Sequence, residues 1–140
     1  MRRIIFVACV LSLALLSACA TLNNKRDKLR DQTLEGYAAA LRWSGFQEAW
    51  SYMDPEVRAS HPLTPQQESL YDTVRVAQYD TPGPVATGPD TLEQTARIGL
   101  ITKASQRVYT VVDHQRWRWD AEANRWWLES GLPDIAPQAQ

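Results

Sequence analysis

The spacing of apolar residues changes after Tyr71, and this change constrains the fold more than any other feature of the 140-residue chain. Up to that point, apolar side chains such as Leu34, Tyr37 and Leu41 recur at the period of an amphipathic helix. Beyond it, apolar and polar side chains alternate, as they do along a β-strand. Helices followed by strands predict an α+β domain in which N-terminal helices pack on an antiparallel β-sheet.

Three helical segments are predicted ahead of the strands. The first begins near Asn24, a residue type that caps helices, and ends at Gly45. A second, short helix follows and stops at Asp54-Pro55. Thr64-Pro65-Gln66-Gln67 then combines an N-cap, a proline in the first turn and a capping-box glutamine. This pattern predicts a third helical turn that runs to about Tyr71.

The remaining chain predicts an antiparallel meander. The predicted strands are 74–80, 92–103, 107–120 and 125–130. The first should lie at the edge of the sheet, because it ends in the turn-forming run Asp80-Thr81-Pro82-Gly83-Pro84. Gly99 lies inside the second strand and predicts a bulge or bend that curls the sheet around the helix.

The N-terminus has the pattern of a secretion signal. Met1-Arg2-Arg3 is a short basic start, and an apolar run from Ile4 to Leu16 follows it. A membrane-spanning helix needs about 20 apolar residues, so this shorter run predicts a cleaved signal peptide over residues 1–18.

Leu16-Ser17-Ala18-Cys19 resembles the bacterial lipobox. The resemblance implies that the signal is cut before Cys19 and that this cysteine becomes the lipid attachment site. In proteins with this motif, a residue other than Asp after the cysteine directs the protein to the outer membrane, and Ala20 stands there. We therefore expect a lipid anchor in the outer membrane with the protein facing the periplasm. The alternative is an ordinary cleaved signal.

Composition excludes several other classes of function. Without Arg2 and Arg3, the 15 basic side chains become 13 against 16 acidic ones, so binding to nucleic acid is not expected. Cys9 leaves with the signal and Cys19 carries lipid, which leaves no thiol for a disulfide or a metal. The histidines and acidic residues do not form a metal-binding pattern, and no cofactor is expected.

The strand 107–120 divides its side chains between two faces. One face carries aromatic residues and could line a cavity with aromatic residues of the helices. The candidate pocket residues are Tyr37, Trp50, Tyr109, Asp113 and Trp117. Alternatively, the tryptophans simply fill a small core.

Asp113 is the carboxylate that this alternation places among apolar neighbours. Desolvation would raise its pKa and suit it to act as a general base. Such chemistry also needs a group that stabilises an oxyanion, for which the candidates are Tyr37, Tyr52 and Tyr109. The alternative is an ion pair between Asp113 and an arginine of a neighbouring strand, such as Arg97.

Arginines gather in the last two predicted strands. If these strands pair, Arg116, Arg118 and Arg125 lie near one another and could form a docking patch together with Trp126. The alternative is the ordinary solvated face of a twisted hairpin.

The C-terminal part of the chain resembles a known superfamily. The segments that carry the resemblance are Val112-Asp113-His114-Gln115-Arg116-Trp117-Arg118-Trp119-Asp120 and Arg125-Trp126-Trp127-Leu128-Glu129-Ser130-Gly131-Leu132-Pro133. They resemble small NTF2-like (cystatin-like cone) lipoproteins of proteobacteria, whose role is unknown. The resemblance implies a helix across the concave face of a curved sheet, with a ligand cavity between them. The resemblance covers roughly Leu29 to Pro133. Together with the polar spacer after Cys19, the sequence predicts a tether over 19–24, a domain over 25–133 and a frayed tail over 134–140.

Together these features predict a non-enzymatic outer-membrane lipoprotein that acts as a binding or assembly module. Its expected partners are the membrane, through the lipid, and another envelope protein or an apolar ligand. A homodimer through the open face of the sheet is compatible with the same pattern. Two alternatives stay open: an isomerase or lyase that uses Asp113 as its base, and a carrier of an apolar ligand.

Overall fold

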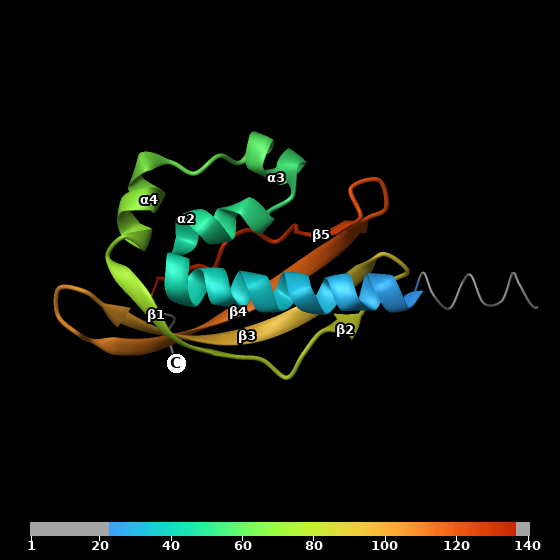
Figure 1. The fold of residues 1–140 in the computed structure, drawn as a ribbon. Helices are drawn as coiled ribbons and strands as arrows, with labels where there is room; N and C mark the ends of the chain where they lie inside the picture. Colours follow the sequence, from blue (N-terminus) through green and yellow to red (C-terminus); the bar gives the residue numbers. More distant parts are fainter. Residues whose placement is uncertain (1–22, 137–140) are drawn as a thin grey trace, which may run out of the picture.

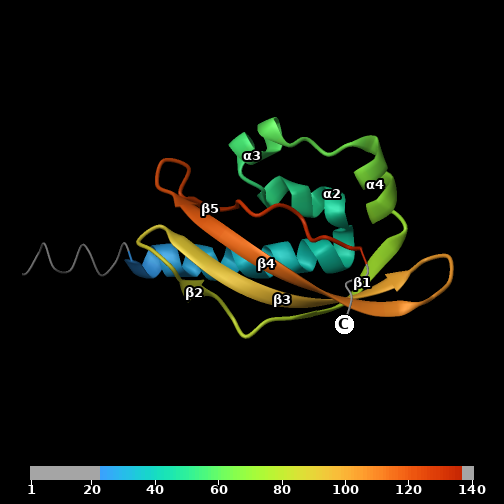
Figure 2. The same cartoon turned by 180° about the vertical axis from the view of Figure 1, so that it is seen from behind.

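Helices lie on one face of a curled antiparallel sheet, so the predicted α+β class is confirmed (Figure 1, and from behind in Figure 2). The computed structural model describes residues 23–136. The predicted signal peptide, Cys19 and most of the predicted tether lie outside the described residues, as do residues 137–140. Within the described part, no helix is both long enough and apolar enough to span a bilayer.

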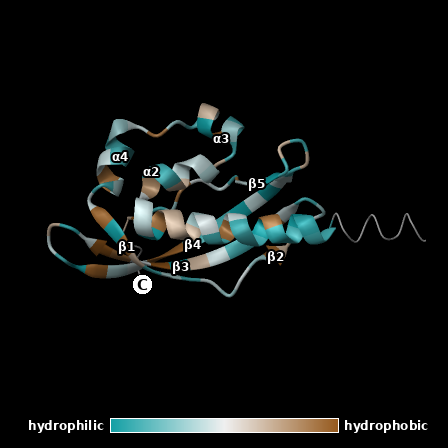
Figure 3. Ribbon diagram, in the orientation of Figure 1, coloured by the Kyte–Doolittle hydropathy of each residue, from teal (hydrophilic) through white to brown (hydrophobic). Residues whose placement is uncertain are grey.

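The N-terminal helix crosses the sheet and supplies much of the core. It occupies residues 23–39 of the described chain and continues as the wider π turn η1 (Ala40–Ser44). It ends at Gly45, as predicted, where φ is 94° and a side chain would be strained. Its buried residues are Leu34, Tyr37, Ala40 and Leu41. Figure 3 shows that the half of this helix next to the predicted tether is the more hydrophilic one.

Four short helical segments follow in an arch beside this helix. They are α2 (Phe46–Ala49), η2 (Trp50–Tyr52), α3 (Pro55–Ser60) and α4 (Pro65–Tyr71). The predicted capping box of α4 is present, with Thr64 and Gln67 bonded to each other's backbone N–H groups. Helix α3 was not predicted, although its start signal is in the sequence: the Asp54 side chain accepts a hydrogen bond from the Glu56 N–H at 2.8 Å.

The sheet has the strand order β1-β3-β4-β5, with a short β2 paired to β3. Its strands are β1 (Val74–Asp80), β2 (Val85–Ala86), β3 (Thr91–Thr102), β4 (Val108–Asp120) and β5 (Arg125–Leu128). The predicted edge position of β1 is confirmed, whereas β2 was not predicted. The predicted irregularity at Gly99 is a shift of register in β1 between Val76 and Gln78, opposite this glycine. A Cβ on Gly99 would lie 3.0 Å from the Gln78 Cβ, so only glycine fits comfortably here.

The core lies between the N-terminal helix and the concave face of the sheet. Ala96, Ile98 and Leu100 of β3 are fully buried there, as their alternation predicts. The chain stays ordered beyond Pro133, because Ile135 is buried and its carbonyl accepts a hydrogen bond from the Tyr109 hydroxyl at 2.8 Å. The prediction of a frayed tail from residue 134 therefore places its start too early.

Candidate functional site

The structure places the candidate pocket residues in the core. Tyr37 and Trp117 are fully buried and pack edge to face, with ring centroids 5.2 Å apart. Trp50 packs against the same core from η2, and the Tyr109 hydroxyl is bonded to the C-terminal segment. These side chains fill the space between helix and sheet, as in the alternative in which the tryptophans form a core.

Asp113 lies on the concave face with 8 % of its surface exposed. The predicted ion pair with Arg97 is wrong: Ala96 stands opposite Asp113 across the β3–β4 pair, so Arg97 belongs to the other face. Within residues 23–136, Asp113 makes no ion pair; its carboxylate accepts a hydrogen bond from Gln115 Nε2 at 2.7 Å. Burial raises the pKa of Asp113 to about 6, and this hydrogen bond partly opposes the rise.

A polar network surrounds Gln115 in the same interior. Gln115 Oε1 accepts from Gln94 Nε2 at 3.1 Å, from the Tyr79 hydroxyl at 3.3 Å and from Trp117 Nε1 at 3.3 Å. Within residues 23–136, the Tyr37 hydroxyl is buried without a hydrogen-bond partner. Burial, reinforced by the charge of Asp113, raises the pKa of Tyr37 well above the usual value. A buried carboxyl whose charge acts on such a hydroxyl has the composition of an acid–base site.

Access to this network is limited. A hollow of about 240 Å³ lies between the N-terminal helix and the segment after β1. Tyr79 and Gln94 line it, but Asp113 and Tyr37 do not. A ligand there would meet this amide and phenol together with the acidic side chains of Asp31 and Glu35. Asp113 is linked to the hollow only through Gln115. The sequence interpretation missed both Tyr79 and Gln94; Gln94 could have been found because it shares the inward alternation of Leu92 and Ala96.

The predicted docking patch is occupied by contacts within the domain. Arg116 Nε lies 3.0 Å from a Glu129 carboxylate oxygen, and Arg118 bonds both Glu129 and Asp54. Asp54 is only 3 % exposed. Burial alone would raise its pKa, but the hydrogen bonds from Arg118 and from the Glu56 N–H lower it overall.

Arg125 and Trp126, the other members of the patch, are also engaged. The Arg125 guanidinium stacks on Trp127 at 4.3 Å from the ring centroid. Trp126 is 4 % exposed, so its predicted exposure is wrong. Its ring and that of Trp119 hold the Arg26 guanidinium, whose carbon lies 5.0 and 5.3 Å from the two centroids. The patch residues therefore tie the hairpin to the helices.

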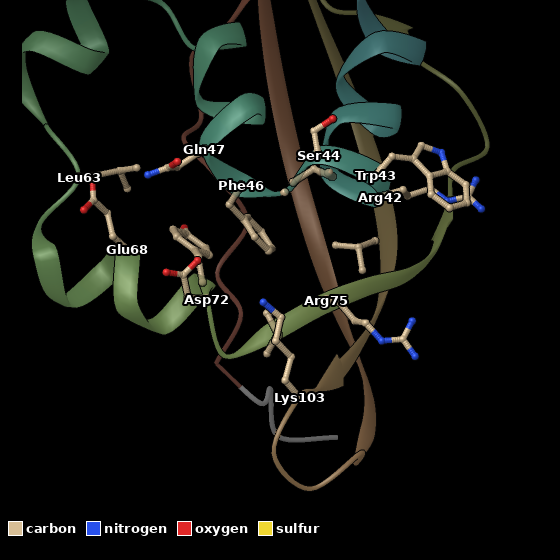
Figure 4. Close-up of a pocket in the computed structure, with 15 residues that line it drawn as sticks. Arg42, Trp43, Ser44, Phe46, Gln47, Leu63, Glu68, Asp72, Arg75 and Lys103 are labelled. Atoms are coloured by element: carbon tan, nitrogen blue, oxygen red, sulfur yellow. The ribbon is translucent and has the colours of Figure 1, made fainter.

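The exposed tryptophan is Trp43, with 77 % of its surface accessible. Trp43 follows the buried Leu41 by two positions, which places it on the opposite side of the helix. This offset from the apolar face of the helix could have predicted its exposure from the sequence. The Arg42 guanidinium lies 5.0 Å from its ring centroid. Both residues border a hollow of about 300 Å³ between η1, α2, α4 and β1 (Figure 4).

Charges are separated across this hollow. Phe46 and Tyr71 stack in its wall with centroids 4.3 Å apart. The α4 side carries acidic residues and the opposite side carries basic ones (Figure 4). The charged residues are Glu68 and Asp72 on the α4 side and Arg42 and Arg75 on the opposite side; Lys103 lies between them, with its N–H bonded to the Thr73 carbonyl just after α4 (Figure 4). Among the described residues, none of the five forms a salt bridge, so their charges are available to a partner.

No protein-family model, curated protein or solved structure matches the chain. In the part of the chain from residue 23 to residue 136, no three His, Cys, Asp or Glu side chains are grouped to hold a metal ion.

Proposed function

We propose that this chain is a non-enzymatic binding module with an NTF2-like domain, held by lipid on Cys19 at the periplasmic face of a bacterial outer membrane. The lipobox-like segment supports the anchor. The observation that supports binding is the exposure of Trp43 beside a hollow whose charged residues form no salt bridges within the described residues. Tryptophan and arginine are the residue types that most often dominate binding energy at interfaces.

The proposed binding surface lies at the end of the domain opposite Asn23, the first described residue. Asn23 is four positions beyond Cys19, a reach of at most about 14 Å even when extended. From Asn23 the helix runs to Ser44, and at about 1.5 Å per residue it is roughly 30 Å long. η1, which carries Trp43, forms its far end, next to α2 and β1 (Figure 1). An anchored domain would therefore present Trp43 away from the lipid.

The gain from covering Trp43 is large enough to support recognition. With 77 % of the side chain exposed, a partner can remove about 150 Å² of mostly apolar surface from water. At about 25 cal/mol per Å² this contributes about 4 kcal/mol before the cost of association.

Site-specific photocrosslinking in intact cells tests the proposal. A benzoylphenylalanine in place of Trp43 should link the chain to a defined envelope protein. The same group in place of the exposed Glu122, in the turn after β4, should not. Equal crosslinks from both positions, or none from position 43, would contradict the proposed surface. Cys19→Ser should abolish palmitate incorporation and release the protein from the membrane fraction; continued membrane attachment would contradict the anchor.

A second candidate is the isomerase or lyase that uses Asp113 as its base. It is favoured by the buried carboxyl with a pKa of about 6 and by the buried Tyr37 hydroxyl, which has no hydrogen-bond partner among the described residues. In a strain that depends on the protein, Asp113→Asn should then abolish function while the crosslink from position 43 persists. Full function of this variant would exclude the catalytic role.

A further inference from the structure

We propose that an extended segment of another polypeptide adds as a strand to the free edge of β1, with an apolar side chain in the hollow beside Trp43 and an acidic one beside Arg75. This inference rests on the proposed function and specifies the chemistry of its partner. Three observations carry it: the open edge, the stacked aromatic rings in the wall of the adjoining hollow, and cations that form no salt bridge among the described residues.

The edge of β1 offers unused backbone groups. β1 pairs with β3 alone. The Lys103 N–H donates to the Thr73 carbonyl at 2.8 Å, which makes Val74 and Thr102 a pair without mutual hydrogen bonds. Antiparallel strands alternate between bonded and non-bonded pairs, so the N–H and C=O groups of Val74 and Val76 point away from β3. Within residues 23–136, no backbone hydrogen bond from another segment reaches these groups.

The open edge and the hollow beside Trp43 form one continuous site. Val74 and Val76 line the hollow together with Phe46 and Tyr71. A strand added at this edge would place alternate side chains toward the stacked rings, as in recognition by β-strand addition. The register shift after Val76 limits regular pairing to the first residues of β1, which are the ones at the hollow.

The charged residues around the hollow further restrict which segments can bind. Arg42 and Arg75 stand on the side of the hollow away from α4, and Lys103 lies between Arg75 and the end of α4 (Figure 4). Among the described residues, none of the three forms a salt bridge. An acidic side chain on the incoming segment would meet these cations. A basic side chain fits only at the α4 side, near Glu68 and Asp72. The expected partner segment is therefore extended, apolar at its centre and acidic toward β1.

A displayed library of random decapeptides, selected on the full lipidated protein, provides the probe. Enriched peptides should combine an aromatic or aliphatic residue with Asp or Glu. A synthetic copy should slow hydrogen exchange of the Val74 and Val76 amides at least tenfold. N-methylation of alternate peptide nitrogens should weaken binding at least tenfold, because strand pairing needs those donors.

Charge reversal gives a matched control. Arg75→Glu combined with Lys103→Glu should weaken binding of the acidic peptide at least tenfold, whereas Arg97→Glu on the outer face of β3 should leave it unchanged. Failure to enrich any peptide, unchanged exchange in β1 or tolerance of N-methylation would each overturn strand addition. The proposed function would survive these results if the crosslink from position 43 remained, and would fail if that crosslink were also absent.

Discussion

The two ends of this domain are built from the same residue types but use them differently. At the end near the predicted tether, Arg26, Trp119 and Trp126 stack together, and Arg26 also pairs with Asp90 at 2.9 Å. At the opposite end, Arg42 stacks on an exposed Trp43. The first group stabilises the fold, whereas the second is available to a partner. A count of tryptophan and arginine cannot distinguish these uses, because burial and pairing decide between them.

The largest expected difference is between two tryptophans. Trp126→Ala should lower the free energy of unfolding by about 3–5 kcal/mol, because it leaves a cavity beside Trp119 and Arg26. Trp43→Ala should change it by less than about 0.5 kcal/mol, since that side chain is exposed. Urea unfolding of both variants measures the contrast. Similar losses at the two positions would remove the distinction between the two ends.

Asp113, in the interior between the two ends, should give the clearest pH dependence. Its folded pKa of about 6 lies above the usual value of 3.8, so the folded state binds the proton more tightly. Stability from this group is therefore fully present below about pH 4 and is lost as pH rises toward 6. At about 1.4 kcal/mol per pKa unit, Asp113→Asn should stabilise the protein by about 3 kcal/mol at pH 7 and remove this slope. Urea unfolding of both proteins between pH 4 and 7 tests this prediction. If the variant kept the same dependence of the unfolding free energy on pH, Asp113 would not be its source.

Arg118 should show that the predicted docking patch stabilises the fold. Arg118→Ala leaves the buried Asp54 carboxylate without its arginine partner, and about 1–2 kcal/mol of stability should be lost after allowance for the partial exposure of Arg118. Because the pair lowers the Asp54 pKa, its contribution is present above about pH 4 and is lost as pH falls through the folded pKa. Arg97→Ala is the control and should have almost no effect. Loss of a crosslinked partner without loss of stability would instead support the docking patch.

The smallest expected effect is at Arg42. Arg42→Ala removes an exposed contact with Trp43 and should change the free energy of unfolding by about 0.5 kcal/mol at most. Thermal unfolding at matched pH measures it. A loss above about 1 kcal/mol would mean that this end also stabilises the fold and is not free for a partner.

Local patterns predicted most of the fold. Alternation placed Ala96, Ile98 and Leu100 in the core, and capping chemistry placed the start of α4 at Thr64. These signals are local because each depends on residues within a few positions. The ordered chain around Ile135 was not predictable in this way, since its burial depends on Tyr109 of β4, 26 positions away.

The candidate sites were predicted less well, for a related reason. Inward alternation correctly placed Asp113 on the concave face, but the choice of its partner required the register between β3 and β4, which the sequence does not state. The pairing of Arg118 with Asp54 joins residues 64 positions apart. Such contacts form only when the whole fold is assembled. A cluster of arginines in the sequence therefore does not tell whether those arginines pair within the domain or are free to bind a partner.

The contacts of Arg26 with the sheet have a mechanical consequence for an anchored domain. Arg26 is seven positions beyond Cys19, and its guanidinium bonds Asp90 and the Pro89 carbonyl while lying between two indole rings. Force applied to the lipid would enter the domain along the first helix and reach the sheet through these contacts within its first turns. We expect the helix and sheet to resist such pulling as one body, so that tension on the anchor would leave the distant surface around Trp43 undistorted.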